Sequence, residues 1–267
     1  MSNKIEALRA RKGGTPIVCL TAYSAPMARA LDPHTDLLLV GDSVAMVLYG
    51  EPTTVGISIE TMILHGKAVS RNATTSIVIV DMPSGTYETS PEQALLSARR
   101  IVDETGCDGV KLEGGVKMAP AIKRITQAGI PVMAHIGLMP QSVEELGGYK
   151  IQGKTPDDAE RMLADARAVE AAGAFSVVIE CSLEPVADKL TQAISVPTIG
   201  IGGSATCDGQ ILVSEDMLGI TAGKLPRFVK KYAEIGTLVT DAAEQYANEV
   251  QARSFPAHEH LYHPKED

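Results

Sequence analysis

Eight short apolar runs, separated by segments with helical patterns, constrain this chain more than any other feature. A regular alternation of strand and helix implies right-handed βαβ units and therefore a parallel sheet. A chain of 267 residues has the length usual for a closed barrel of eight such units. We therefore predict a single-domain (β/α)8 TIM barrel over residues 1–267, with a polar C-terminal tail from about residue 251. The eight runs span residues 16–23, 37–43, 76–83, 108–115, 131–138, 175–182, 197–203 and 209–213.

Several helix boundaries can be predicted from capping residues. Ser90, followed by Pro91 and Gln93, predicts a helix start with a capping box, and Thr155 begins a similar segment. The Gly-rich segment 137–155, which follows the fifth run, is a candidate lid. The least regular parts of the pattern are the eighth run and the short helices expected after the first and seventh runs. Glycines that can end a helix in the left-handed conformation are Gly106, Gly129 and Gly173.

The composition excludes several classes of protein. Aromatic residues make up only 4% of the chain, and an aliphatic core suits parallel strands that are buried on both faces. The net charge of -9 argues against a nucleic-acid partner, and no apolar stretch reaches the roughly 18 residues of a membrane span. The charged N-terminus lacks a signal-peptide pattern, so we expect a cytoplasmic protein without a membrane partner. Reduced thiols in the core are expected for Cys19, Cys107, Cys181 and Cys207, which form no CxxC motif.

Polar residues gather at the C-terminal ends of five consecutive runs. In a barrel these ends meet at one rim, where active sites are built. An isolated acid at the end of a strand is about as often a helix cap or a surface ion-pair partner as it is a functional residue. Five or six polar residues at the ends of consecutive strands, however, are not expected by chance. The sequence therefore predicts a site at this rim. Its candidate residues are Asp42, Ser43, Asp81, Lys111, Glu113, His135 and Glu180.

The residue types indicate the chemistry of this site. Four carboxylates that lie close together repel one another unless a cation neutralises them. Oxygen ligands favour a hard cation, and a few carboxylates with retained waters are typical of Mg²⁺. A carboxylate that does not bind the metal can act as a base, and Lys111 can hold an anionic substrate. The absence of paired thiols argues against a structural zinc site.

Two other motifs are weaker. The segment "GIGGSA" (200–205) matches the dinucleotide-binding pattern in form, but no long helix follows it and no acid lies about 20 residues further on. A glycine-rich loop that borders a ligand or phosphate is the better interpretation. The segment "HEHLYH" (258–263) holds metal-binding residue types, but in a polar tail such a group is more often adventitious.

Seven segments of the chain resemble one enzyme family and occur in the order expected of it. They are "LLLVGDS", "DMPSGTYETSPEQA", "VKLEGG", "HIGLMPQS", "GGYKIQG", "VVIEC" and "IGIGGSATCDGQILV". The chain thereby resembles the ketopantoate hydroxymethyltransferase family over nearly its whole length. That family transfers a one-carbon unit from 5,10-methylenetetrahydrofolate to 3-methyl-2-oxobutanoate, giving 2-dehydropantoate and tetrahydrofolate in pantothenate synthesis.

The resemblance implies specific roles for the rim residues. It implies that Asp42 and Asp81 ligate Mg²⁺ and that Glu113 completes the metal site, directly or through water. It implies that Glu180 is the proton acceptor, and that the protein is a cytoplasmic homo-oligomer, often a decamer. Small molecules, the oxo acid and the folate, are the implied partners. The implied contacts to the oxo acid are Asp42, Ser43, Asp81, Lys111 and His135.

Two alternatives remain open at this stage. The first is another Mg²⁺-dependent barrel that acts on 2-oxo acids, such as a carbon–carbon lyase of the isocitrate lyase type. Those enzymes usually carry a "KKCGH"-like cysteine loop, which this sequence lacks. The second is a barrel that serves as a metabolite-binding or scaffold protein, which we would expect to have lost some of the rim acids.

Overall fold

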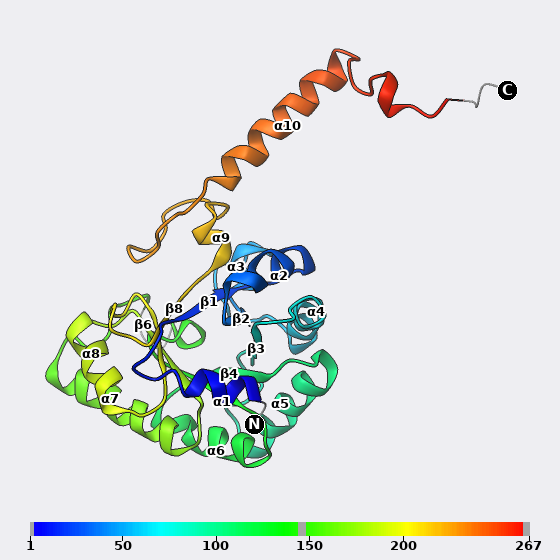
Figure 1. Ribbon diagram of the computed structural model, residues 1–267. Coiled ribbons are helices and arrows are strands. Elements are labelled where there is room, and N and C mark those ends of the chain that lie inside the picture. Colours follow the sequence, from blue (N-terminus) through cyan, green and yellow to red (C-terminus); the bar gives the residue numbers. More distant parts are fainter. Residues whose placement is uncertain (1–2, 144–147, 264–267) are drawn as a thin grey trace. The chain divides into compact units, whose positions relative to one another are not determined.

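A computed structural model describes residues 3–143 and 148–263 of the chain. Eight parallel strands form a closed barrel in chain order, and β8 pairs with β1 to close it (Figure 1). The predicted (β/α)8 fold class is therefore confirmed. The strands are β1 (Ile17–Thr21), β2 (Leu37–Val40), β3 (Ile77–Asp81), β4 (Gly109–Glu113), β5 (Val132–Gly137), β6 (Ser176–Glu180), β7 (Thr198–Ile201) and β8 (Gly209–Leu212).

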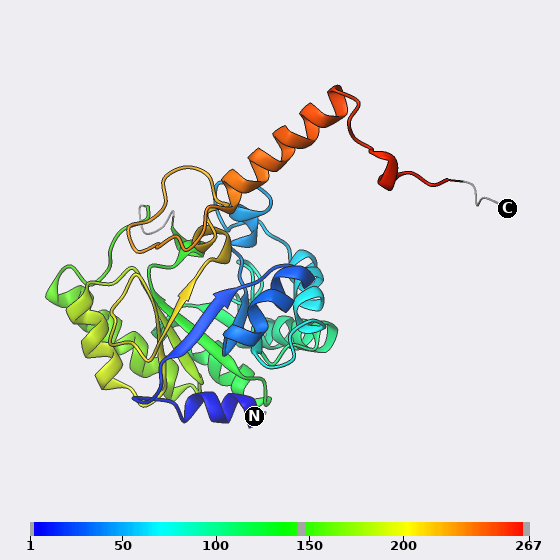
Figure 2. The ribbon, with the colours of Figure 1, turned by 45° about the horizontal axis from the view of Figure 1, so that its top comes forward.

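Helices cover the outside of the barrel (Figure 2). One expected helix is missing, because the described residues 202–208, between β7 and β8, form turns rather than a helix. This segment joins two glycines to small polar residues, which have low helix propensity and no apolar face to bury. The helices are α1 (Asn3–Arg9), α2 (Ala25–Leu31), α3 (Val44–Val47), α4 (Ile59–Ser70), α5 (Pro91–Thr105), α6 (Ala119–Gln127), α7 (Pro156–Ala171), α8 (Glu184–Ala193), α9 (Ser214–Met217) and α10 (Ile235–Gln251), with 3-10 turns η1 (Asp32–His34), η2 (Val116–Met118), η3 (Pro140–Ser142) and η4 (His258–His260).

The predicted helix caps are present. Ser90 Oγ accepts a hydrogen bond from the N–H of Gln93, and Thr155 Oγ1 accepts one from Asp158, both at 3.1 Å. The Gln93 side chain accepts from the N–H of Thr89 instead of Ser90, so the reciprocal half of the capping box is shifted by one residue. The three predicted helix-ending glycines all have positive φ, at Gly106 (70°), Gly129 (85°) and Gly173 (94°).

The interior of the barrel follows the two-residue period of its strands. In β3, Ile77 and Ile79 belong to the interior apolar cluster, and Asp81 follows in the same alternation. Met133 and His135 of β5 have the same relationship. Ile5 and Leu8 of α1 join this cluster. Thus the alternation that builds the apolar interior also brings polar side chains inward at its C-terminal rim.

Two aspartates near the N-terminal ends of the strands accept hydrogen bonds from backbone N–H groups. Asp32 accepts hydrogen bonds of 2.8–3.1 Å from the N–H groups of residues 74–76, just before β3. Burial acts to raise the pKa of Asp32, but these hydrogen bonds outweigh it and hold that pKa well below its ordinary value. Asp208 accepts from the N–H of Thr198 and from Lys12 Nζ, at 2.8 and 2.9 Å. These acids therefore join loops to strands.

The four cysteines are free thiols, as predicted. Three of them, Cys19, Cys107 and Cys207, are buried. The fourth, Cys181, is only half-buried and has a φ of 49° directly after β6, so the prediction of a core position was wrong for it. Burial, and then the charge of Glu180, raises the pKa of the Cys181 thiol to about 12. This thiol is therefore not activated.

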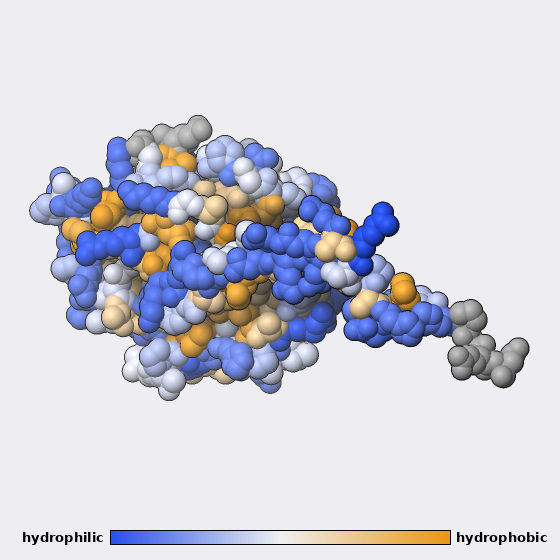
Figure 3. Space-filling model, turned by 90° about the horizontal axis from the view of Figure 1, so that it is seen from above, coloured by the Kyte–Doolittle hydropathy of each residue, from blue (hydrophilic) through white to orange (hydrophobic). Residues whose placement is uncertain are grey.

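The chain divides into two compact units, residues 1–214 and 215–267, and the first contains the whole barrel. The single domain over residues 1–267 stays a prediction. In the second unit, α10 has no buried residue, and Leu238, Val239 and Tyr246 are about 60% exposed. Figure 3 shows one face of the molecule, on which hydrophilic side chains surround smaller apolar areas. Across residues 3–143 and 148–263, we find no helix with both the length and the apolar content needed to span a bilayer.

Candidate active site

All seven predicted site residues lie in or directly after the C-terminal ends of β2 to β6. The pairing of the strands sets their neighbours. Asp81 of β3 is in register with Lys111 of β4, and Glu113 of β4 is in register with His135 of β5. Glu180 is the last residue of β6, one strand further around the rim. The barrel thus brings the side chains together from five consecutive strand ends.

A buried ion pair joins Asp81 to Lys111. Lys111 Nζ lies 2.5 Å from Asp81 Oδ1, and the backbone N–H of Asp42 donates to Asp81 Oδ2 at 3.0 Å. Burial raises the pKa of Asp81 to about 6; Lys111 opposes this rise, and the nearby Asp42 charge adds to it. Burial alone would lower the pKa of Lys111, but Asp81, Asp42 and other carboxylates raise it above its ordinary value. Lys111 is therefore a charged group at neutral pH.

His135 lies between two carboxylates. Its Nδ1 is 3.6 Å from Glu113 Oε1, and its Nε2 is 3.3 Å from Glu180 Oε2. Among the described residues, Glu113 Oε1 and both ring nitrogens of His135 are buried without a hydrogen-bond partner. Burial, and then the charge of Asp42, raises the pKa of Glu113 well above its ordinary value of 4.5. Buried polar groups are nearly always satisfied, so these atoms mark a place where a ligand or ion belongs.

Ser43 is not a helix cap. It stands at the N-cap position of α3, but its side chain makes no capping hydrogen bond. Its hydroxyl instead lies 2.7 Å from the hydroxyl of Tyr23. A Cβ on Gly41 would lie 2.9 Å from Ser43 Oγ and 3.6 Å from Asp81 Oδ2. A side chain at position 41 would therefore require Ser43 to move.

Two residues of the site were missed by the sequence analysis. Gln141, in η3 after β5, donates from Nε2 to Asp42 Oδ2 at 2.9 Å and from its backbone N–H to Glu113 Oε2 at 3.1 Å. The Tyr87 hydroxyl donates to Gln141 Oε1 at 2.6 Å. Both residues lie in loops beyond the strand ends, so a search of the strand ends alone could not find them. Their proximity depends on how the two loops fold.

Tyr149 approaches the site from the predicted lid, residues 137–155. Its hydroxyl contacts Met46 Sδ at 3.9 Å. Partial burial, and then the charges of Glu180 and Asp42, raises the pKa of Tyr149. Residues 144–147 of the predicted lid lie outside the described residues.

The donor set fits a hard cation that shares its ligands with a substrate. Within residues 3–143 and 148–263, no group of three or more His, Cys, Asp or Glu side chains is arranged so that it could hold a metal ion by itself. Mg²⁺ does not need one, because it usually keeps several waters and takes one or two carboxylates plus substrate oxygens. Asp42 and Asp81 are neighbours, joined by the hydrogen bond from the Asp42 backbone N–H to Asp81 Oδ2, and Glu113 Oε1 is a buried acceptor without a hydrogen-bond partner among the described residues. The residues therefore fit Mg²⁺.

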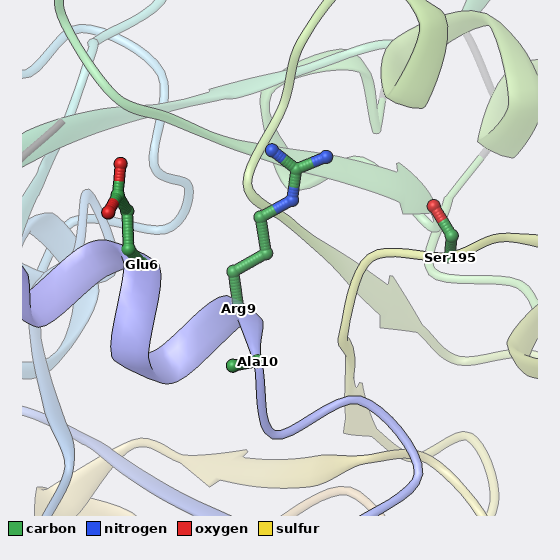
Figure 4. Close-up of a pocket in the computed structure, with 4 residues that line it drawn as sticks. All are labelled: Glu6, Arg9, Ala10 and Ser195. Atoms are coloured by element: carbon green, nitrogen blue, oxygen red, sulfur yellow. The ribbon is translucent and has the colours of Figure 1, made fainter.

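Two cavities lie outside this cluster. The larger, of about 600 Å³, is lined by Glu6, Arg9, Ala10 and Ser195. Figure 4 shows that the Glu6 and Arg9 side chains extend from α1, while Ser195 comes from a separate loop, the segment before β7. A second cavity, of about 370 Å³, lies between α3 and the start of α4. None of the seven rim residues lines either cavity, and the candidate active site therefore rests on the contacts within the rim cluster rather than on a cavity.

Sequence comparisons connect the whole barrel with one family. A model of the family described as "Ketopantoate hydroxymethyltransferase" matches residues 2–258. The 3-methyl-2-oxobutanoate hydroxymethyltransferase of Mesorhizobium japonicum is 60% identical over 257 residues, which are 96% of this chain and 90% of that protein. The enzyme of the same name from Bordetella petrii is 54% identical and covers 96% of this chain and 93% of its own.

Comparisons with solved structures support the fold. A putative phosphonomutase from Burkholderia cenocepacia has a TM-score of 0.62 at 18% identity and covers 93% of this chain and 98% of its own. A 2,3-dimethylmalate lyase of the PEP mutase/isocitrate lyase superfamily has a TM-score of 0.61 at 17% identity. The match covers 93% of this chain and 88% of the lyase. A phosphonopyruvate hydrolase, solved with oxalate and Mg²⁺, has a TM-score of 0.60 at 13% identity. The match covers 98% of this chain and 93% of the hydrolase. At these identities the likeness concerns the fold alone.

Proposed function

This chain belongs to the ketopantoate hydroxymethyltransferase family, and we propose that it transfers a hydroxymethyl group from 5,10-methylenetetrahydrofolate to 3-methyl-2-oxobutanoate. The products are 2-dehydropantoate and tetrahydrofolate, and atom balance requires one water. The observation that carries this proposal is the rim cluster itself. It combines a charged Lys111 paired with Asp81, the neighbouring Asp42, and two further carboxylates, Glu113 and Glu180, on the two sides of His135.

The oxo acid is held by its carboxylate and its 2-oxo group. Lys111 is the charged donor of the cluster, and it supplies an ammonium group to an anionic substrate. Ser43 offers a hydroxyl that is not used as a helix cap. The ring nitrogens of His135, which have no hydrogen-bond partner among the described residues, belong to the same cluster and can bind a substrate oxygen. These residues would orient the substrate with its C3 hydrogen toward a base.

Asp42 and Asp81 would hold Mg²⁺, and Glu113 would complete the site directly or through water. When bound, the metal would polarise the 2-oxo group and stabilise the negative charge of an enolate by several kcal/mol. The burial of the site would also help to stabilise the enolate, because charges interact more strongly where water is excluded.

Glu180 is the proposed proton acceptor at C3. Its side chain is 14% exposed, and β6, which carries it, lies two strands around the barrel from β4, which carries Lys111. His135 Nε2 lies 3.3 Å from Glu180 Oε2, so the imidazole is a close neighbour of this carboxylate. Removal of the C3 proton leaves an electron pair that forms the new carbon–carbon bond with the methylene carbon of the folate. The two bonds of that carbon to the folate nitrogens N5 and N10 break, and the oxygen of one water supplies the hydroxyl group. A carboxylate positioned in this way is a typical general base.

We also propose that the protein works as a cytoplasmic homo-oligomer, a decamer as the resemblance implies. Exposed apolar side chains on α10, such as Leu238 and Val239, support association, since such surfaces are usually covered. Light scattering on the purified protein tests this proposal. A monomer at micromolar concentration would contradict it.

The enzymatic proposal is tested by one assay. The protein is incubated with 3-methyl-2-oxobutanoate, methylenetetrahydrofolate and Mg²⁺, and ketopantoate is measured by mass spectrometry. We expect product only when all three are present, and exchange of the C3 hydrogen with D₂O in the absence of folate. Failure of both reactions would contradict the proposal. Cleavage of a substituted malate would instead support a lyase, and binding of the oxo acid without turnover would support a binding protein.

A further inference from the structure

We propose that Gln141, held in place by Tyr87, is a positioning residue that orients Asp42 and Glu113 for binding the cation and the oxo acid. This inference rests on the proposed function, because it concerns the same site. It assigns a task to two residues that lie outside the strand ends. A residue that only stabilised the loop after β5 would affect stability, whereas loss of a positioning residue also weakens binding.

The amide of Gln141 is hydrogen-bonded on both sides. Nε2 donates to Asp42 Oδ2 at 2.9 Å and to the carbonyl of Met82 at 3.0 Å, which uses both of its hydrogens. Oε1 accepts from the Tyr87 hydroxyl at 2.6 Å. A flipped amide would place its oxygen against the Asp42 carboxylate and its NH₂ against a hydroxyl donor. The network therefore permits one orientation, the one in which Asp42 receives a donor.

Tyr87 determines that orientation. Its side chain is buried, with the residue only 2% exposed, and its hydroxyl oxygen accepts from the backbone N–H of Glu113 at 3.3 Å. The hydroxyl hydrogen is thus available for Gln141 Oε1. Tyr87 is therefore a fixed donor.

The backbone of Gln141 extends the network to Glu113. Its N–H donates to Glu113 Oε2 at 3.1 Å, while Glu113 Oε1 has no hydrogen-bond partner among the described residues. One oxygen of Glu113 is anchored and the other is left for a ligand. Asp42 is anchored through Oδ2 by the side chain of the same glutamine. A single residue thus restrains two carboxylates that come from β2 and β4.

Residues that only orient a metal ligand still matter to affinity, because their loss typically costs about 10–100-fold in metal binding. We therefore expect Gln141→Met, which preserves the length of the side chain but none of its hydrogen bonds, to weaken Mg²⁺-dependent binding of 3-methyl-2-oxobutanoate by about 10–100-fold. Tyr87→Phe removes one hydroxyl and should weaken it by about tenfold or less. If Tyr87 acts through Gln141, the double variant should bind no more weakly than Gln141→Met alone.

Isothermal titration calorimetry measures this binding, with Mg²⁺ titrated alone and with the oxo acid titrated in excess Mg²⁺. Urea unfolding shows that each variant is folded. Gln152→Met is the matched control: Gln152 is a buried glutamine of the same loop that bonds Arg161 and the Lys150 carbonyl. It should change stability but not affinity.

The outcomes separate the two proposals. Wild-type affinity in folded Gln141→Met, or effects of the two substitutions that add in full, would overturn the positioning role and leave the proposed function intact. If the wild-type protein itself binds no oxo acid, the proposed function fails and this inference fails with it.

Discussion

Lys111 Nζ lies 2.5 Å from Asp81 Oδ1, and the two side chains are only 5% and 2% exposed. The register of β3 with β4 places these residues side by side. One ammonium group therefore balances a carboxylate that is itself in contact with Asp42. Removal of one partner from a buried pair leaves an uncompensated charge, which costs more than the pair contributes.

Lys111→Met should accordingly lower the free energy of unfolding by about 3–5 kcal/mol at pH 8. The pKa of Asp81 in the folded protein, about 6 even with Lys111 present, exceeds the ordinary value of 3.8. The folded state thus binds the proton more tightly, and the variant should lose stability relative to wild type as the pH rises from 5 to 8. Urea unfolding at both pH values measures this. The double variant with Asp81→Asn should recover most of the loss; a double variant as unstable as the single one would contradict the account.

Glu113→Gln should stabilise the metal-free protein at neutral pH by about 1–3 kcal/mol. The pKa of Glu113 is raised well above 4.5 by burial, so its ionisation costs stability as the pH rises toward the folded-state value. The difference from wild type should therefore grow from pH 5 to pH 8. Thermal unfolding in EDTA provides the measurement, and Glu184→Gln, at an exposed position, is the control. A variant less stable than wild type at pH 8 would exclude this electrostatic penalty.

Glu180→Gln should retain Mg²⁺ and oxo-acid binding but slow exchange of the C3 hydrogen with D₂O by about 10²–10⁴-fold. The substitution preserves shape while it removes the basic oxygen. Proton NMR follows the exchange and calorimetry the binding. Exchange at the wild-type rate would assign the base to another residue.

Asp42→Asn should weaken Mg²⁺ and oxo-acid binding together. Loss of a direct ligand is expected to cost at least the roughly 10–100-fold associated with residues that orient a ligand. Asp157→Asn, in the exposed first turn of α7, serves as the control for an aspartate that only favours a helix. Calorimetry that finds both affinities unchanged would remove Asp42 from the metal site.

Gly41→Ala should reduce oxo-acid affinity with a moderate loss of stability, about 1–3 kcal/mol. The new Cβ would lie 2.9 Å from Ser43 Oγ, a movable side-chain atom, so Ser43 is expected to rotate away from Tyr23. In a Ser43→Ala background, the same substitution should cost less stability because that atom is gone. An equal cost in both backgrounds would mean that the strain arises elsewhere.

The fold was predictable because the strand pattern repeats. All eight strands lie within the predicted runs, and the caps at Ser90 and Thr155 follow from local chemistry. The rim position of the seven candidate residues follows from the barrel. Sequence order could not reveal Gln141 or Tyr87, whose contact joins loops 54 residues apart. The segment 202–208 is a turn because seven residues with glycine and small polar side chains can connect adjacent strands without a helix.

Acidic residues serve opposite purposes at the two ends of this barrel. Asp32 and Asp208, near the N-terminal ends of the strands, satisfy backbone N–H groups and have lowered pKa values. Asp81 and Glu113, at the other end, are held at raised pKa values. Protonation of Asp32 and Asp208 at low pH would therefore weaken their hydrogen bonds to the backbone. Protonation of Asp81 and Glu113 would remove negative charge from the rim. A protein engineer could strengthen the scaffold and retune the pocket separately, since the two sets of acids share no hydrogen-bond partner among the described residues.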